Sequence, residues 1–490
     1  ACLVGSEMCI RDSIDHSGLI PLMYVNGFRG QVYSTSATAQ LCEIMLRDSA
    51  HIQMFEAEWR NRKAARSGGK LKEFVPLYDM DAAVNVCKQF VGCEYDRVYD
   101  IAEGIKIRFT DVGHLLGSAS IEVWATEKTE NGDVTEKIVF SGDIGNINKP
   151  IIKDPKHVRD ADYVVMESTY GNRSHGGTPN YVEDLTDIFK RTFERGGNVV
   201  IPSFAVGRTQ ELLYIIRKIK EDNLVGRDFD VYMDSPLAIE ATNIFIKNVE
   251  SCFDDDAVEL VRKGINPLSF PGLKYATTGD ESKQINFDPN PKVIISSSGM
   301  CEAGRIRHHL KHNLWRPECT IVFVGYQAVG TTGRIIVDGA EEIKLFGEPI
   351  QIKAEIVQLK GSSGHADKDG LLCWINAFDT KPKKVFVVHG EDSVCDEFTE
   401  CLKEEYGYDA MAPYTGGSYD LIADRVISEG VKERKTRRTT STQRGKTVFD
   451  RLVAAGKRLM TVITHNEGGT NKDLAKFTDQ INALCDKWDR

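Results

Sequence analysis

The stretch EKIVFSGDIGN (136–146) joins an apolar run to a short turn that carries an acid beside a glycine. The segment EKIVF (136–140) has the composition of a buried β-strand. In open α/β folds the reactive groups lie just beyond the carboxyl ends of strands. Asp143 stands at such a position, and its small neighbour Gly142 leaves room for a metal or substrate to come close. The stretch therefore predicts an α/β fold with a functional carboxylate at a strand end.

Apolar runs of the same kind recur outward from this stretch in both directions, and most lead into Gly, His, Asp or Glu. Helical segments separate them, which is the pattern of an α/β fold. The predicted strands lie at 105–109, 136–140, 163–167, 198–204, 292–297, 320–326 and 383–389.

Two of the intervening segments, 38–59 and 208–222, carry apolar residues at helical spacing. We expect both to be amphipathic helices. For the second, Thr209 is the predicted N-cap, because threonine side chains accept hydrogen bonds from the first free backbone N–H groups of a helix. The positions expected to face the core are Leu212, Leu213 and Ile216.

Length and composition exclude several classes of protein. At 490 residues the chain exceeds the range of a single core, so we expect two or more domains or a large insertion. Its twelve cysteines form no CxxC pairs, which argues against a disulfide framework or zinc ribbon and favours a reducing, cytoplasmic location. No run approaches about 18 apolar residues, so no membrane partner is expected. With a net charge of −10, nucleic-acid binding requires a local basic surface.

Candidate metal ligands stand in four short segments. They are IDHSG (14–18), DVGHLLGSA (111–119), FSGDIGN (140–146) and VVHGE (387–391). A lone His or Asp after a strand is more often a turn residue or a cap than a ligand. Five imidazole and carboxylate positions in order favour metal ligands instead, since these groups are the ligands of hydrolytic zinc centres. The five candidates are Asp15, His16, His114, Asp143 and His389.

This order of residues resembles the metallo-β-lactamase superfamily, in which HxHxDH is followed by a distant His, a bridging Asp and a final His. It is most similar to the nucleic-acid-processing β-CASP branch, through ESTYGN (167–172), SSGHA (362–366) and VVHGE. Supporting strings lie at 201–214, 296–310 and 325–334, and the similarity extends from Ile14 to Ile422. The resemblance implies an α/β fold: a metallo-β-lactamase αββα sandwich, missing its first strands, with an inserted α/β β-CASP domain.

The resemblance also implies the roles of the site residues. Asp15, His16 and His389 would bind one zinc ion, and Asp143 would bridge to a second zinc ion that His114 also binds. His365 would contact the scissile phosphate and protonate the departing oxygen, with Glu167 supporting its charge. Together with Asp15, these two residues form the expected catalytic set. Alone, Glu167 would be read as a strand-end carboxylate.

RNA is the expected substrate, because the RNA-acting members of the family share a histidine at the position of His389 and the DNA-acting members have an apolar residue there. We therefore predict zinc-dependent RNA phosphodiester hydrolysis, leaving endonuclease and 5′-exonuclease modes open, with a homodimer as the candidate assembly. The helix residues His308 and His309 are more often exposed than catalytic. The predicted phosphate-binding residues are Arg208, Ser298, Ser363, Arg305, His308 and Arg334, of which Arg208 and Ser298 come first.

The domain boundaries follow from the same alignment. Residues 14–171 and 356–430 would form the metallo-β-lactamase domain, and 172–355 the β-CASP domain. Residues 431–490 would form a basic linker, beginning VKERKTRR, and a small helical extension.

The chain departs from the family pattern at its start, where Arg11 and Ser13 stand in place of the first two histidines. A guanidinium is cationic and only donates hydrogen bonds, and a serine hydroxyl is a poor zinc ligand. We expect residues 1–13 to be foreign to the fold, the parent to be truncated, one zinc position to be incomplete, and activity to be impaired.

Two alternatives remain open at this point. The chain could be a non-catalytic RNA-binding scaffold of the β-CASP type, for which Arg11 and Ser13 are the argument. It could also be a hydrolase of a small thioester or lactam, which leaves the inserted domain unexplained.

Overall fold

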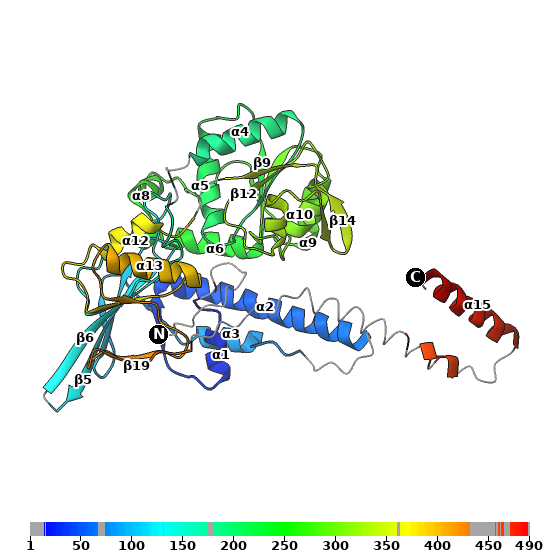
Figure 1. Cartoon of the computed structure of the whole chain (residues 1–490). Helices are drawn as coiled ribbons and strands as arrows, with labels where there is room; N and C mark the ends of the chain where they lie inside the picture. The colour runs from blue at the N-terminus through cyan, green and yellow to red at the C-terminus, as the bar shows by residue number, and fades with distance from the viewer. Residues whose placement is uncertain are drawn as a thin grey trace. The chain divides into compact units, whose positions relative to one another are not determined.

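The computed structural model describes residues 14, 16–66, 74–130, 132–174, 176, 180–359 and 363–431, together with parts of 456–488 (Figure 1). Arg11, Ser13 and Asp15 lie outside the described residues, so the predictions made for them stay untested. The chain divides into two compact units, Ala1–Gly430 and Val431–Arg490.

A seven-stranded sheet forms the first lobe of the larger unit, in the order β17-β16-β7-β6-β5-β4-β3. The neighbours β3 to β6 pair antiparallel, whereas β6, β7, β16 and β17 pair parallel. The strands are β3 (Val98–Ala102), β4 (Ile105–Asp111), β5 (Ala119–Thr129), β6 (Gly132–Phe140), β7 (Tyr163–Met166), β16 (Lys384–Val387) and β17 (Ala410–Met411).

Two helices cover one face of this sheet, α12 (Lys368–Ile375) and α13 (Asp392–Glu404) (Figure 1). Trp374 of α12 and Phe398 of α13 are fully buried in one cluster with Val164 of β7. On the other face, Tyr163 and Phe386 pack with residues of the hairpin β18 (Ser418–Asp420) and β19 (Arg425–Ser428). The sheet is therefore covered on both sides, which suits the parallel strands at its centre.

A six-stranded, all-parallel sheet forms the second lobe, in the order β10-β9-β11-β8-β12-β15. Its central strands are continuous apolar runs, as expected where both faces are covered. The strands are β8 (Val199–Pro202), β9 (Asp230–Asp234), β10 (Leu273–Tyr275), β11 (Lys292–Ser296), β12 (Thr320–Phe323) and β15 (Glu355–Gln358). The helices of this lobe are α4 (Tyr181–Glu194), α5 (Arg208–Glu221), α6 (Pro236–Lys247), α7 (Val249–Cys252), α8 (Asp255–Arg262), α9 (Gly279–Phe287), α10 (Ile306–Asn313) and α11 (Thr332–Val337).

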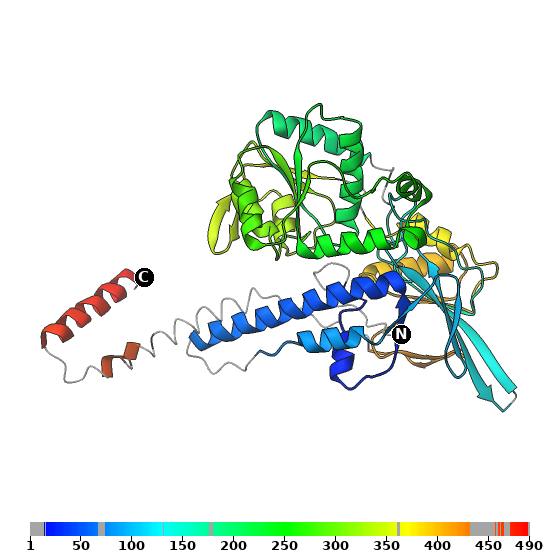
Figure 2. The same cartoon turned by 180° about the vertical axis from the view of Figure 1, so that it is seen from behind.

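A long helix, α2 (Ser36–Arg66), joins the cores of the two lobes (Figure 2). Its buried residues Leu41 and Met45 belong to the same apolar cluster as Ile244 and Phe245 of α6. The remaining elements around it are α1 (Ile20–Val25), α3 (Met80–Cys87) and the parallel pair β1 (Val32–Thr35) and β2 (Phe90–Cys93). A hairpin of β13 (Glu342–Leu345) and β14 (Glu348–Gln351) completes the second lobe.

The predicted α/β fold is confirmed, and each predicted apolar run contains a strand. The predicted helix at 38–59 is longer at both ends, and the predicted core residues Leu212, Leu213 and Ile216 are buried. The N-cap prediction for Thr209 was wrong. Gly207 caps α5, its N–H donating to Gln210 Oε1 at 2.7 Å, while the Thr209 hydroxyl donates to the Phe204 carbonyl.

The smaller unit contains the helix α15 (Asn471–Trp488). Among the described residues, no helix combines the length and apolar character that crossing a membrane requires.

Candidate metal centre

Four histidines and one aspartate converge where strands of the seven-stranded sheet end. Asp143 follows β6 and His114 follows β4, while His389 follows β16 and His16 lies before α1. Asp143 Oδ1 lies 3.2 Å from His16 Nε2 and 3.5 Å from His389 Nδ1. On the other side, Asp143 Oδ2 lies 3.8 Å from His114 Nε2. Residues almost four hundred positions apart in sequence thus share one carboxylate.

The donor atoms form two groups that could each hold a cation, and Asp143 belongs to both. One group is His16, Asp143 and His389, and the other is His114, Asp143 and His365. Within each group, one ligand atom per residue lies within 4.8 Å of the others. His114 Nδ1 and Asp143 Oδ1 are buried and make no hydrogen bond of good geometry to the residues that the structure describes, although Oδ1 lies close to His16 Nε2. Buried polar atoms rarely lack a partner, so this arrangement fits metal ions bound on either side of Asp143.

The protonation states favour a metal. Burial opposes ionisation of Asp143, but the imidazoles of His365, His16 and His389 outweigh it and hold the pKa of the carboxyl well below its ordinary value. Burial and the neighbouring His365 lower the pKa of His114 to about 3. An ionised carboxylate and a neutral imidazole are the forms that bind a metal ion.

Tight backbone crossings hold the ligand loops together. Gly113 has a φ of 65°, and a Cβ atom there would lie 2.6 Å from the Lys153 carbonyl oxygen, so this position requires glycine. His389 also adopts a left-handed backbone, with a φ of 52°. A non-glycine residue rarely does so outside functional or constrained sites.

His365 lies against Glu167, whose Oε2 and Oε1 are 3.1 and 3.3 Å from His365 Nδ1. The Glu167 side chain is buried, and its Oε1 also accepts a hydrogen bond from the Ile144 N–H. Burial disfavours a charge on His365, but the Glu167 and Asp143 carboxylates outweigh this effect and raise its pKa above the ordinary value. The protonated imidazole is therefore favoured beside the metal groups.

Three of the predicted phosphate-binding residues lie on loops or at the start of a helix. Ser363 lies beside His365, whose N–H donates to its Oγ at 3.1 Å. Arg208 begins α5 and is paired with Glu211 at 2.5 Å. Ser298 is buried, and its hydroxyl donates to the Ala303 carbonyl within its own loop.

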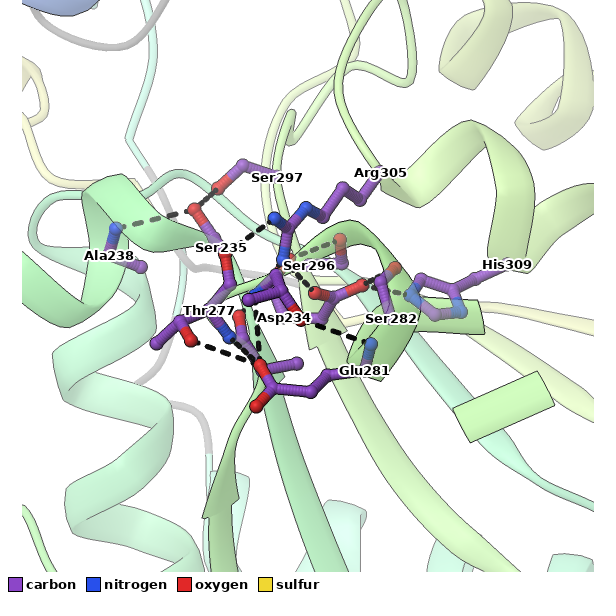
Figure 3. Close-up of polar contacts among 12 residues, drawn as sticks. Asp234, Ser235, Ala238, Thr277, Glu281, Ser282, Ser296, Ser297, Arg305 and His309 are labelled. Carbon is purple, nitrogen blue, oxygen red and sulfur yellow. Dashed lines mark hydrogen bonds and ion pairs between the residues drawn. The ribbon is translucent and has the colours of Figure 1, made fainter. Parts of the chain in front are cut away.

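Arg305 holds the inner structure of the second lobe, because its guanidinium donates to Asp234 Oδ1 and to the carbonyls of Ala276 and Thr277. This geometry argues against the predicted phosphate contact. The expectation that His309 is exposed was wrong. It is fully buried, and its Nε2 lies 2.6 Å from Asp234 Oδ2. Figure 3 shows these side chains converging on the Asp234 carboxylate.

His308 and Arg334 contact neighbouring residues of the second lobe. The His308 ring stacks on Phe346 of the β13–β14 hairpin, with 4.4 Å between ring centroids. Arg334 is paired with Asp338 on the surface of α11. Neither contact supports the predicted role in phosphate binding.

Sequence reasoning missed two buried charged residues beside the centre, Lys149 and Glu211, which are 3.1 Å apart. Lys149 stands in GNINKP after the Asp143 turn, and Glu211 follows Arg208 on a helix that reads as ordinary and amphipathic. Charged residues at core-facing positions of that helix were the signal that could have indicated them.

Comparison with known proteins agrees with this architecture. A sequence model described as the Beta-Casp domain matches residues 209–336, which lie in the second lobe. A second one, described as a Zn-dependent metallo-hydrolase RNA specificity domain, matches residues 349–413, which contain His365 and His389. The fold is thus the metallo-β-lactamase fold with an inserted β-CASP domain.

Several curated relatives match most of the chain. A ribonuclease of Thermus thermophilus is 32% identical over 389 residues, 79% of this chain and 82% of that protein. An RNase J-like protein of Methanocaldococcus jannaschii is 31% identical, covering 77% and 79%. The transcription termination factor FttA of Methanosarcina mazei is 32% identical over 81% of this chain, which spans 60% of that longer protein. By these matches, the chain belongs to the β-CASP family of metallo-β-lactamase-fold proteins.

Proposed function

We propose that this protein is a zinc-dependent ribonuclease that hydrolyses RNA phosphodiester bonds at the centre built around Asp143. The observation that carries the proposal is the convergence of His16, His114, His365 and His389 on that one carboxylate. A carboxylate shared by two histidine groups is the donor set of a two-metal hydrolytic site. The relatives named ribonuclease and RNase J-like, and the matched RNA specificity domain, support RNA as the substrate.

Each group of residues has a distinct part in the proposed reaction. His16 and His389 would hold one zinc ion with Asp143, and His114 would hold the other. Zinc held there would lower the pKa of water and stabilise charge on the phosphate oxygens. The role of Asp15, predicted as a further ligand, belongs to this proposal.

His365 is the proposed general acid. Its protonated form is favoured by Glu167, and Glu167 is fixed by the Ile144 N–H, so the imidazole is held in one orientation. A proton at this position can pass to the departing 5′ or 3′ oxygen, which typically contributes about 10²–10⁴-fold to rate. Ser363 and Arg208 are the proposed phosphate contacts.

The proposal also assigns a role to each domain and a location to the protein. Residues 14–171 and 356–430 would supply the metal ligands, and 172–355 would close over the RNA. The cysteines that the structure describes are all free, which supports a reducing cytoplasmic location. A homodimer remains a proposal for which the described residues give no specific contact.

The direct test is to measure zinc in the purified chain and to follow cleavage of one RNA labelled at its 5′ end, as monophosphate and as triphosphate. We expect zinc in the protein, cleavage that stops on chelation and resumes with zinc, and no cleavage by D143N. Cleavage of both RNAs at internal sites indicates an endonuclease, and stepwise loss from the monophosphate alone indicates a 5′-exonuclease.

The alternatives give different results in the same experiment. Tight RNA binding without bound metal or cleavage would favour the scaffold reading over the enzyme. Hydrolysis of a small thioester or lactam with intact RNA would contradict the proposed substrate. Replacing Arg11 and Ser13 by histidine tests the expected impairment, because cleavage should then increase.

A further inference from the structure

A loop that follows Asp143 contacts the segments that carry His114 and His365 in the first lobe. The Gly145 N–H donates to the Val112 carbonyl at 2.8 Å, two residues before His114. The Asn146 N–H donates to the Gly364 carbonyl at 3.2 Å, next to His365. The segment after Asp143 therefore positions the loops that carry both remaining donors of the second metal group.

Lys149 extends from this loop toward His114. Its Nζ donates to the His114 backbone carbonyl at 3.0 Å. A Cβ atom added at Gly364 would lie 3.7 Å from the same Nζ. The Lys149 side chain is only 10% exposed, so its ammonium group is withdrawn from bulk water beside the metal centre.

The counter-charge for Lys149 comes from the inserted lobe. Glu211, in the first turn of α5, places Oε1 3.1 Å from Lys149 Nζ and Oε2 2.5 Å from Arg208 NH1. Burial opposes the Glu211 charge, but the two cations outweigh it and lower the pKa of this carboxyl. We call Lys149, Glu211 and Arg208 the charge bridge.

The two lobes are in close contact at this point. A Cβ atom at Gly207, the residue before Arg208, would lie 2.5 Å from Leu115 Cδ2, the residue after His114. The charge bridge therefore lies beside a close contact between the N-terminus of α5 and the His114 loop.

We propose that Lys149 is a positioning residue for the metal ligand His114, and that Glu211 of the inserted lobe holds Lys149 in place for this task. The inference rests on the proposed function, because it assumes that His114 binds a metal ion. Groups that orient a metal ligand from behind typically change metal affinity by about 10–100-fold when they are removed. Through the charge bridge, the inserted lobe sets the geometry of a metal site whose candidate ligands, among the described residues, come from the first lobe.

A purely structural ion pair is the competing explanation, and Lys153 provides the matched control. It lies on the same loop and also joins the two lobes, because its Nζ donates to the Ser251 carbonyl at 2.8 Å. The Lys153 contact is exposed and does not reach a ligand residue. Loss of either lysine removes one cation and one contact between the lobes.

The experiment is a titration of chelator-treated full-length protein with Co²⁺, followed by visible absorbance, for wild type, K149M, K149R and K153M. The binding step lost in H114A identifies the site in question. We expect K149M to weaken that step by about 10–100-fold, K149R to recover part of the affinity, and K153M to bind as wild type does. Thermal unfolding of the metal-free proteins reports any general loss of structure.

The role of Glu211 is tested by E211Q and by the double variant K149M/E211Q. If Glu211 acts through Lys149, the double variant should bind Co²⁺ about as weakly as K149M, since residues in one network are not additive. Wild-type affinity in K149M, or an equal loss in K153M, overturns the inference while leaving the ribonuclease proposal intact. Absence of Co²⁺ binding by the wild-type protein contradicts the proposed function itself.

Discussion

One histidine–carboxylate pair in each lobe can be compared, and the two differ in what surrounds them. His365 lies 3.1 Å from Glu167 in the first lobe, and His309 lies 2.6 Å from Asp234 in the second. In the second pair, the Asn286 side-chain oxygen lies 3.0 Å from the other ring nitrogen of His309. Ser282 and Arg305 donate to the Asp234 carboxylate (Figure 3).

The first pair opens onto the atoms of the metal centre. The His365 side chain is 22% exposed and shares a group with His114 and Asp143, whose buried Nδ1 and Oδ1 atoms make no hydrogen bond of good geometry to the described residues. Residue types are similar in the two pairs, but the second pair is fully buried and the first is not. The two pairs also differ in their neighbours, because the first lies beside the donor atoms of the candidate metal centre and the second lies among residues that hydrogen-bond one another. The first pair is therefore the one placed to act on a ligand.

The largest expected effect is that of D143N, which removes the charge shared by both metal groups. We expect metal content and RNA cleavage to fall by more than about 100-fold, beyond the typical cost of losing an outer-shell partner. Elemental analysis and a cleavage assay measure the two. D234N is the contrasting variant: its folded fraction should keep full metal content, and a metal loss there would remove the distinction between the two clusters.

The next effect concerns H365Q, which should lower cleavage by about 10²–10⁴-fold if His365 is the general acid. Zinc content should change little, whereas an equal loss of zinc would make His365 primarily a ligand.

E167Q tests the role of His365 as general acid through the pH dependence of cleavage. The Glu167 charge raises the pKa of His365, so the protonated acid is present below that raised value and lost as pH rises through it. Without this charge the pKa falls, and the alkaline limb of the rate profile should move to lower pH. An unchanged limb would show that another group sets it.

The architecture was predictable from the sequence because it depends on local patterns. Parallel strands such as β8 and β12 are continuous apolar runs, and polar residues follow them at the carboxyl edge. The ligand candidates stood out because Asp143 and His389 occupy such positions beside glycine. The convergence of these ligand candidates was inferred from family resemblance, because local sequence patterns do not determine the order of strands in a sheet.

The parts that were missed depend on distant partners. His309 sits among polar residues on a helix, and its burial is made tolerable by Asp234, 75 positions earlier in the chain. Lys149 and Glu211 are likewise compensated only across the junction of the lobes. From the sequence alone, a charged residue is predicted to be exposed, because the residue that neutralises its charge is not known.

The fourth prediction tests the pair of His309 and Asp234. H309Q removes one of the groups that compensate the buried Asp234 carboxylate and should lower the free energy of unfolding by about 3–5 kcal/mol. Urea unfolding of metal-free protein measures this. H312Q, on the exposed side of the same helix, should change it by less than about 0.5 kcal/mol. Loss of metal affinity in folded H309Q would contradict a purely structural role.

The smallest effect concerns Asp111, a third buried aspartate at a strand end. It accepts one hydrogen bond, from the Gly113 N–H at 3.0 Å, and burial raises its pKa from 3.8 to about 6. Because the folded state holds this proton more tightly than the unfolded state, its contribution to stability is fully present below about pH 4. The contribution is lost as pH rises through about 6.

D111N keeps the acceptor oxygen and removes the charge, so it should stabilise the protein by about 2 kcal/mol at pH 8 and by little at pH 4. Urea unfolding of the metal-free protein at both pH values measures this difference. Asp234 has the opposite sign, since hydrogen bonds from His309, Ser282 and Arg305 outweigh its burial and lower its pKa. D234N should therefore cost most stability at pH 8. If both variants moved stability in the same direction there, the degree of hydrogen-bond satisfaction would not be what separates the buried carboxylates of the two lobes.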